Sequence, residues 1–214
     1  MTSSDDYDFR TDLVRRERFP ADPAGGPFAT VVIDPPWRYG DRLPGPGRGA
    51  EKHYPTLSQN ELLWMTRLVD FNLATNAHVY IWTTNSFVPE AYELMEWFDA
   101  EHKTNITWVK VKNGHVAYDR EVEAYALDQS DVRMGMGHYW RGAAEHCLFG
   151  VRGRLPAKVH NLTNVVVSEQ GKHSQKPRVF YDLVEQMSPG PYLEIFARDQ
   201  GRLGWTAWGN EVSQ

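Results

Sequence analysis

The stretch Phe28-Ala-Thr-Val-Val-Ile33, followed at once by Asp34-Pro35-Pro36-Trp37, decides how this chain folds. Its first part is nearly continuously apolar and β-branched, which is typical of a strand covered on both faces. The two prolines end that strand, because proline donates no hydrogen bond to a sheet and disfavours helix in the residue before it. The sequence therefore predicts a buried strand with an aspartate at its carboxyl end.

Strand and helix patterns alternate along the rest of the chain. Apolar runs predict further strands at 78–84, 106–111, 146–151, 164–167 and 192–196. Helical spacing predicts helices over about 59–74, over 89–103, and from Pro177 to the stop at Ser188-Pro189-Gly190. This alternation predicts an α/β fold with a mostly parallel sheet and helices on both of its faces.

Two segments, 38–57 and 113–142, have no regular period and are predicted to be mobile loops of the kind that often bind ligands. Directly after the first of them, Ser58 and Glu61 have the spacing of a capping box. This pair predicts that a helix begins near residue 59.

Composition limits the class of protein. The 214 residues, 41% apolar and 13% aromatic, can bury a full core, which excludes a disordered chain or a disulfide scaffold. We expect a polar N-terminal arm over 1–26 and a single domain over 27–214. No apolar run approaches the ~20 residues of a membrane span, the N-terminus is acidic, and Cys147 is the single cysteine. These features predict an intracellular, cytoplasmic protein.

Net charge limits the partners. The 23 Lys+Arg against 28 Asp+Glu give a formal charge of −5, which argues against a wide face that neutralises phosphates. A local basic groove remains open. His138, His146 and Cys147 do not have the spacing of a structural zinc site, so no metal is expected.

Asp34 and its neighbours suggest a chemistry. Ligands of open α/β sheets bind outside the carboxyl ends of the strands, where this aspartate lies. An amine attached to an aromatic ring is a poor nucleophile, and two acceptors for its N–H groups would direct its lone pair towards an electrophile. Asp34 and the Pro35 carbonyl could supply the two acceptors, Pro36 would keep that carbonyl rigid, and Trp37 could stack on a flipped base.

Ten blocks in the same order resemble the MT-A70 family of S-adenosylmethionine-dependent N(6)-adenine methyltransferases. The resemblance covers about residues 27–211. The blocks are Asp34-Pro-Pro-Trp37, His53-Tyr-Pro-Thr-Leu-Ser58, Tyr80-Ile-Trp-Thr-Thr84, Trp108-Val-Lys110, Gly135-Met-Gly-His138, Glu145-His-Cys-Leu-Phe-Gly150, Ser174-Gln-Lys-Pro177, 183–189, Glu194-Ile-Phe-Ala-Arg198 and 205–210. The resemblance implies a Rossmann-like methyltransferase fold in which the catalytic block precedes the cofactor strand, the permuted, β-type motif order.

The resemblance also implies roles for the matching residues. Catalysis would fall to Asp34, Pro35, Pro36 and Trp37, with the aspartate between the cofactor and the target amine. The implied contacts to S-adenosylmethionine are Asp34, Lys176, Glu194, Arg198, Asp199, Gln200, Gly201, Asn210 and Glu211. The implied contacts to the substrate are Trp37, Tyr54, His138 and Glu145.

The implied reaction is methylation of the 6-amino group of adenine in DNA or RNA. One alternative is a catalytically silent, nucleic-acid-binding partner subunit of a methyltransferase complex, although such subunits usually lack the acid-Pro-Pro-aromatic block that this chain keeps. Another is an N-methyltransferase for small molecules or proteins, which would share the cofactor site. The expected partners are DNA or RNA containing adenine, with no membrane, and a homodimer or a partner subunit is open.

Overall fold

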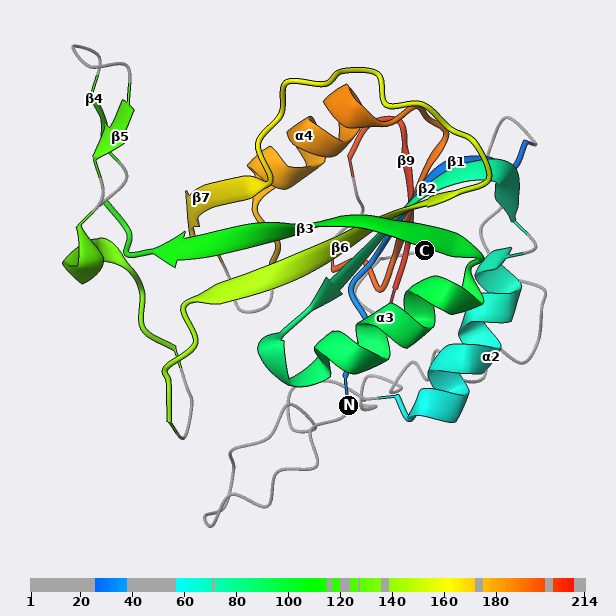
Figure 1. The fold of residues 1–214 in the computed structure, drawn as a ribbon, viewed down its shortest axis with the longest axis horizontal. Coiled ribbons are helices and arrows are strands. Elements are labelled where there is room, and N and C mark those ends of the chain that lie inside the picture. The colour runs from blue at the N-terminus through cyan, green and yellow to red at the C-terminus, as the bar shows by residue number, and fades with distance from the viewer. Residues whose placement is uncertain are drawn as a thin grey trace, which may run out of the picture.

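The computed structural model describes residues 26–37, 57–70, 72–114, 117–119, 124–126, 128–135, 139–171, 175–198 and 202–209. Seven strands form one sheet in the order β7-β3-β6-β2-β1-β8-β9 (Figure 1). Their bounds are β1 Phe28–Ile33, β2 Leu73–Thr83, β3 Ala100–Val111, β6 Ala144–Arg152, β7 Val165–Glu169, β8 Tyr192–Ile195 and β9 Trp205–Trp208. All pairs are parallel except those that β6 makes with β2 and β3, so the predicted mostly parallel sheet is confirmed.

Helices cover both faces of the sheet, as predicted. α2 (Gln59–Asp70) and α3 (Val88–Trp97) lie on one face and α4 (Arg178–Met187) on the other (Figure 1). Consecutive side chains of β1 show why the strand is largely apolar. Val31 and Ile33 belong to the core beneath α2 and α3, whereas Val32 belongs to the core beneath α4. Because strand side chains alternate between faces, a strand covered on both sides is mostly apolar, and its one hydroxyl, that of Thr30, donates to the Pro189 carbonyl at 2.7 Å.

The start of α2 confirms the predicted capping box. The Ser58 backbone N–H donates to Glu61 Oε2 at 2.7 Å, and the Glu61 N–H donates to Ser58 Oγ at 3.4 Å. Each side chain therefore satisfies a backbone donor that has no partner within the helix. A carboxylate in the first turn is further stabilised by the helix dipole.

The predicted C-terminal ends of α2 and α3 were wrong. The helix expected over 59–74 ends at Asp70, and Leu73 already begins β2. The helix expected over 89–103 ends at Trp97, where the Asp99 N–H closes the last turn onto Glu96 and Asp99 takes a left-handed φ of 51°. Residues 100–103 therefore extend β3. The polar side chains of residues 101–103 are compatible with a helix or a strand. The left-handed backbone at Asp99 ends the helix and so makes these residues part of the strand.

Four features of the structure were not predicted: a hairpin, two 3-10 turns and a strand. The segment 113–142, expected to be irregular, contains a hairpin of β4 (Ala117–Asp119) and β5 (Ala124–Ala126), which projects from the body of the domain (Figure 1), and a 3-10 turn, η3 (Gln129–Asp131). A second 3-10 turn, η2 (Asn85–Phe87), precedes α3. Strand β9 also has no counterpart among the predicted elements. Residues 1–25 of the arm predicted over 1–26, and residues 38–56 of the loop predicted over 38–57, lie outside the described residues.

Within the described part of the chain, the helices are all too short or too polar to cross a lipid bilayer.

Candidate active site

Asp34 lies directly after β1, at the edge where the parallel strands end. Its backbone N–H donates to the Ile195 carbonyl at the end of β8, at 3.3 Å. The Trp37 N–H donates to the Pro35 carbonyl at 2.8 Å, and the Leu57 N–H donates to the Pro36 carbonyl at 3.0 Å. The acid-Pro-Pro-aromatic block is thus held from both sides. The Pro35 carbonyl keeps a second lone pair for a further donor.

Four charged side chains alternate in sign at this edge. Lys176 Nζ lies 2.9 Å from Asp34 Oδ1 and 3.0 Å from Glu145 Oε2, and Lys110 Nζ also bonds Glu145. We call these four residues the charge chain. The side chains of Lys176, Glu145 and Asp34 are only 9%, 16% and 19% exposed, so their charges interact with little screening by water.

The antiparallel strand β6 explains how the charge chain assembles. Because β6 runs against β2 and β3, its first residues lie where those strands end. Glu145 pairs with Trp108 of β3, two residues before Lys110, so the Glu145 and Lys110 side chains lie on the same face of the sheet. Lys176 comes from the segment just before α4, next to the N-cap residue Pro177. Residues distant in sequence therefore meet at one edge of the sheet.

Burial and charge set the protonation of these groups. Burial raises the pKa of Asp34, and the Lys176 ammonium opposes that rise. Burial also works against ionisation of Glu145, but the ammonium groups of Lys176 and Lys110 outweigh it and lower the pKa of that carboxyl. Burial disfavours a charged Lys176, yet the two carboxylates raise its pKa above the usual value. Lys176 consequently stays protonated, and Asp34 is the carboxyl of the pair that protonates first as the pH falls.

Aromatic rings lie against the two lysines of the charge chain, Lys176 on Trp82 and Lys110 on Trp108. Trp37, 7% exposed, stacks on Phe87 with centroids 5.4 Å apart, and its Nε1–H donates to the Trp82 carbonyl at 3.2 Å. Lys176 Nζ lies 5.1 Å from the centroid of the Trp82 ring, a cation–π contact. Phe87 thus covers one face of the Trp37 indole, and the predicted stacking of a base on Trp37 stays a prediction for its other face.

The ends of β8 and β9 form the second side of the site. Glu194 accepts a hydrogen bond from the Tyr181 hydroxyl at 2.6 Å, and the charge of Arg198 acts on Asp34. Phe196 follows β8 with a left-handed φ of 64°, which a residue other than glycine rarely adopts. A Cβ on Gly209 would lie 2.2 Å from the Ala197 carbonyl oxygen, so the chain after β9 approaches this turn more closely than any side chain allows.

Replacing Gly209 by alanine is expected to destabilise the protein by about 1–3 kcal/mol, the usual cost of forcing extra atoms into a packed region. The new methyl group would overlap backbone atoms, which cannot move aside as a side chain can. Urea unfolding measures the effect. Gly171→Ala is the matched control, because its Cβ would meet only the end of the Gln175 side chain. Equal stability of the two variants would contradict the close approach.

The structure brings several predicted site residues together and leaves others undescribed. Asp34, Lys176 and Glu145 are in direct contact, and Glu194 and Arg198 lie at the neighbouring strand end. The predicted residues outside the described part of the chain are Tyr54, His138, Asp199, Gln200, Gly201, Asn210 and Glu211.

Sequence reasoning gave no role to Lys110, Phe87, Tyr181 and Gly209. Lys110 was within a family block, and an isolated glycine next to a strand is a known signal of close backbone approach, so two of the four carried a usable signal. Phe87 and Tyr181 carried none.

The histidine and cysteine considered for a metal have other partners. His146 bonds Thr107 Oγ1 through Nδ1 at 3.2 Å and Asn85 Oδ1 through Nε2 at 2.9 Å. Cys147 is fully buried in the sheet, and burial raises the pKa of its thiol. Among the residues with described positions, no group of three or more His, Cys, Asp or Glu side chains is placed to hold a metal ion.

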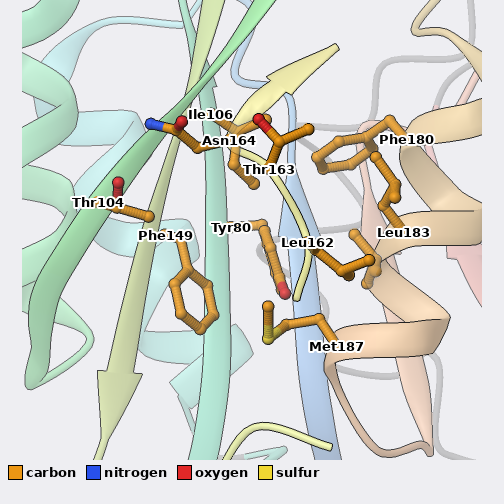
Figure 2. A pocket seen from close by; sticks show the side chains of 11 residues that line it. Tyr80, Thr104, Ile106, Phe149, Leu162, Thr163, Asn164, Phe180, Leu183 and Met187 are labelled. Carbon is orange, nitrogen blue, oxygen red and sulfur yellow. The ribbon is translucent and has the colours of Figure 1, made fainter. Parts of the chain in front are cut away.

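A small apolar cavity lies between the sheet and α4. Tyr80 and Phe149 from the sheet face Phe180, Leu183 and Met187 from α4 around it (Figure 2). It encloses about 80 Å³, far below the roughly 300–1,000 Å³ of ligand sites. No member of the charge chain lines it. We therefore regard it as a packing gap beneath α4 and not as a reaction site.

A mostly parallel sheet with helices on both faces, and with an acidic group at the carboxyl end of a central strand, is a Rossmann-like methyltransferase fold. The MT-A70 family model matches residues 28–211. The chain belongs to the MT-A70 family.

Two similar proteins, one from a plant and one from human, are named as N(6)-adenosine-methyltransferases. The chain is 30% identical over 191 residues to a putative N(6)-adenosine-methyltransferase MT-A70-like protein of Medicago truncatula, covering 88% of this chain and 27% of that one. It is 29% identical to the N(6)-adenosine-methyltransferase catalytic subunit METTL3 of Homo sapiens, covering 87% of this chain and 28% of that one. The chain thus spans about a quarter of the length of these relatives.

A relative of similar size has a different description. The chain is 25% identical over 204 residues to the type II methyltransferase M.MunI of a Mycoplasma species, covering 86% of this chain and 78% of that protein.

Proposed function

We propose that this protein transfers a methyl group from S-adenosylmethionine to the 6-amino group of adenine in DNA or RNA. One observation carries the proposal: a carboxylate at the end of β1, 19% exposed, is held 2.9 Å from a buried ammonium group. Family membership and the names of the relatives support the same reaction.

The residues at the strand ends fit the cofactor. S-adenosylmethionine carries a carboxylate, an ammonium and a positively charged sulfur, so its site needs charges of both signs. Arg198 and Lys176 offer cations to a carboxylate, whereas Asp34 and Glu194 offer anions. The strained turn at Phe196 and the close approach of Gly209 keep the ends of β8 and β9 together beside them. When bound, the cofactor supplies an electrophilic methyl group.

Asp34 prepares the amine. Its carboxylate accepts one N–H of the adenine amino group, and the free lone pair of the Pro35 carbonyl accepts the other. These bonds favour a tetrahedral nitrogen whose lone pair points away from the ring. They also stabilise the positive charge that develops on this nitrogen as it gains the methyl group. Asp34 or water then takes the surplus proton, and no covalent intermediate with the protein is needed.

Lys176 keeps Asp34 ionised. A buried carboxyl next to a second carboxylate would take up a proton and would no longer offer a negative charge to the amine. The ammonium 2.9 Å from Asp34 and 3.0 Å from Glu145 opposes both effects, so the pKa of Asp34 rises less than burial alone would raise it. Lys110 in turn neutralises Glu145 from its other side. The charge chain thus favours the ionised form of Asp34 at the end of β1.

Labelled-methyl transfer tests the proposal. Purified protein is incubated with labelled S-adenosylmethionine and with single-stranded or duplex DNA or RNA, or with free nucleosides, and the products are digested and analysed by mass spectrometry. We expect label on adenine N6 in at least one polymer. Label on free nucleosides or proteins alone would favour a different substrate class. Cofactor binding by calorimetry separates a silent partner subunit, which should give no heat.

A further inference from the structure

Two aromatic side chains in the segment just before β6 stand almost fully in solvent. Tyr139 and Trp140 are 97% and 94% exposed, whereas such large rings are usually at least partly buried. They lie in the segment that leads from η3 into β6, the strand that carries Glu145. Figure 1 shows that this segment extends beyond the sheet at the edge where β3 ends and β6 begins.

The segment is closed into a loop at its base. The Gly135 N–H donates to the Gly142 carbonyl at 2.7 Å, and Arg141 Nε–H donates to the Gly135 carbonyl at 2.6 Å. A Cβ on Gly135 would lie 2.5 Å from the Gly142 oxygen, so this closure requires glycine. We call residues 135 and 139–142 the aromatic loop. Its two rings therefore stand on a fixed base.

The aromatic loop is anchored to the charge chain. The Arg133 N–H donates to the Lys110 carbonyl at 2.8 Å, and the Lys110 N–H donates to the Ala143 carbonyl at 2.9 Å. The chain is thus held to Lys110 just before and just after the loop, and the Lys110 ammonium bonds Glu145. Glu145 is the fifth residue after Trp140 along the chain, so their Cα atoms lie within about 18 Å of each other.

The chemistry of the aromatic loop fits unpaired bases. A chain with a net charge of −5 gains little from general attraction to phosphates, whereas stacking of a base on an aromatic ring needs no charge. Arg133 and Arg141 are exposed next to the rings and can contact phosphates or stack on bases themselves. A protein partner would need a wider apolar patch, and Met134 is the one other exposed large apolar residue described in this segment.

We propose that Tyr139 and Trp140 form a stacking platform for bases that flank the target adenine in a single-stranded nucleic acid. This inference rests on the proposed function, because the platform serves the same site. It adds a substrate class: unpaired strands are favoured over duplexes, and longer strands over nucleosides.

Binding to a fluorescent single-stranded oligonucleotide with one adenine, measured by anisotropy, tests the platform. The double variant Tyr139→Leu, Trp140→Leu keeps apolar bulk but removes the aromatic rings, and we expect its Kd to rise about tenfold or more. The variant with Phe at both positions should bind as the wild type does. Tyr92→Leu, which removes a partly exposed ring from α3, is the matched control and should also leave the Kd unchanged.

A second ligand sharpens the test. An oligonucleotide whose flanking nucleotides lack bases should bind wild type about tenfold more weakly, and should bind the double Leu variant no more weakly than the intact strand does. Equal Kd values of wild type and the Leu variant for the intact strand would overturn the platform. So would a change of oligomeric state on Leu substitution, since the rings would then bind a second copy. Labelled-methyl transfer to adenine, assayed separately, decides the proposed function whichever way binding turns out.

Discussion

Replacing Asp34 by asparagine is expected to lower kcat/KM for methyl transfer about a hundredfold to a thousandfold, the usual loss when one preorganised group is removed from a reacting centre. Asparagine has nearly the same shape, but its amide carries no charge and presents one acceptor oxygen instead of two. The positive charge that develops on the amino nitrogen would then lack its counter-charge. Steady-state assays with labelled S-adenosylmethionine measure the loss.

The fold should survive this change. Lys176 keeps its contact with Glu145 at 3.0 Å, so the ammonium group is not left without a counter-charge. Asp182→Asn is the matched control, because Asp182 is half exposed and pairs with Arg202 on the surface. That variant should react at the wild-type rate. A wild-type rate for the Asp34 variant would show that another group prepares the amine.

Replacing Lys176 by methionine is expected to move the acidic limb of the pH–rate profile upward by about one to three pH units, the range by which a nearby opposite charge lowers a carboxyl pKa. The reaction needs ionised Asp34, so the rate falls as the pH drops through the pKa of that group. Burial already raises this pKa, and Lys176 opposes the rise. Without the ammonium, Asp34 would lie in a buried place beside Glu145 and would protonate at a higher pH.

The stability of the Lys176→Met variant should respond to pH in the same sense. A carboxyl whose pKa is higher in the folded than in the unfolded protein binds more protons when folded, between those two pKa values. The free energy of unfolding of the Lys176→Met variant should therefore increase as the pH is lowered from neutral towards the ordinary aspartate pKa near about 4. Lys103→Met is the control, since Lys103 pairs with Glu101 at an exposed site and should leave both profiles unchanged. An unshifted acidic limb in the Lys176 variant would contradict the role of the charge chain.

The position of Asp34 could be predicted because every signal for it is local. An apolar β-branched run makes a buried strand, and two prolines end it. Asp34, which lies between that run and the prolines, is therefore at the strand end. The start of α2 was predictable for the same reason, since Ser58 and Glu61 lie within one turn of each other.

The charge chain could not be predicted as a unit. Lys110, Glu145 and Lys176 are far apart in sequence, and their contact depends on β6 lying antiparallel between β2 and β3. An apolar strand pattern is the same in either direction, so no local signal reveals that insertion. Strand β9 escaped detection because its sequence, Trp205-Thr-Ala-Trp208, contains none of the Val, Ile or Leu residues that marked the predicted strands, including the equally short β8.

The single-turnover rate of methyl transfer tests the central claim most directly. Excess protein is first saturated with labelled S-adenosylmethionine and then mixed with the adenine-containing strand, so neither cofactor binding nor product release limits the rate. We predict that this rate falls in the Asp34→Asn variant by about the same factor as kcat/KM, a hundredfold or more. A single-turnover rate within about twofold of wild type would contradict the claim that this carboxylate prepares the amine for transfer.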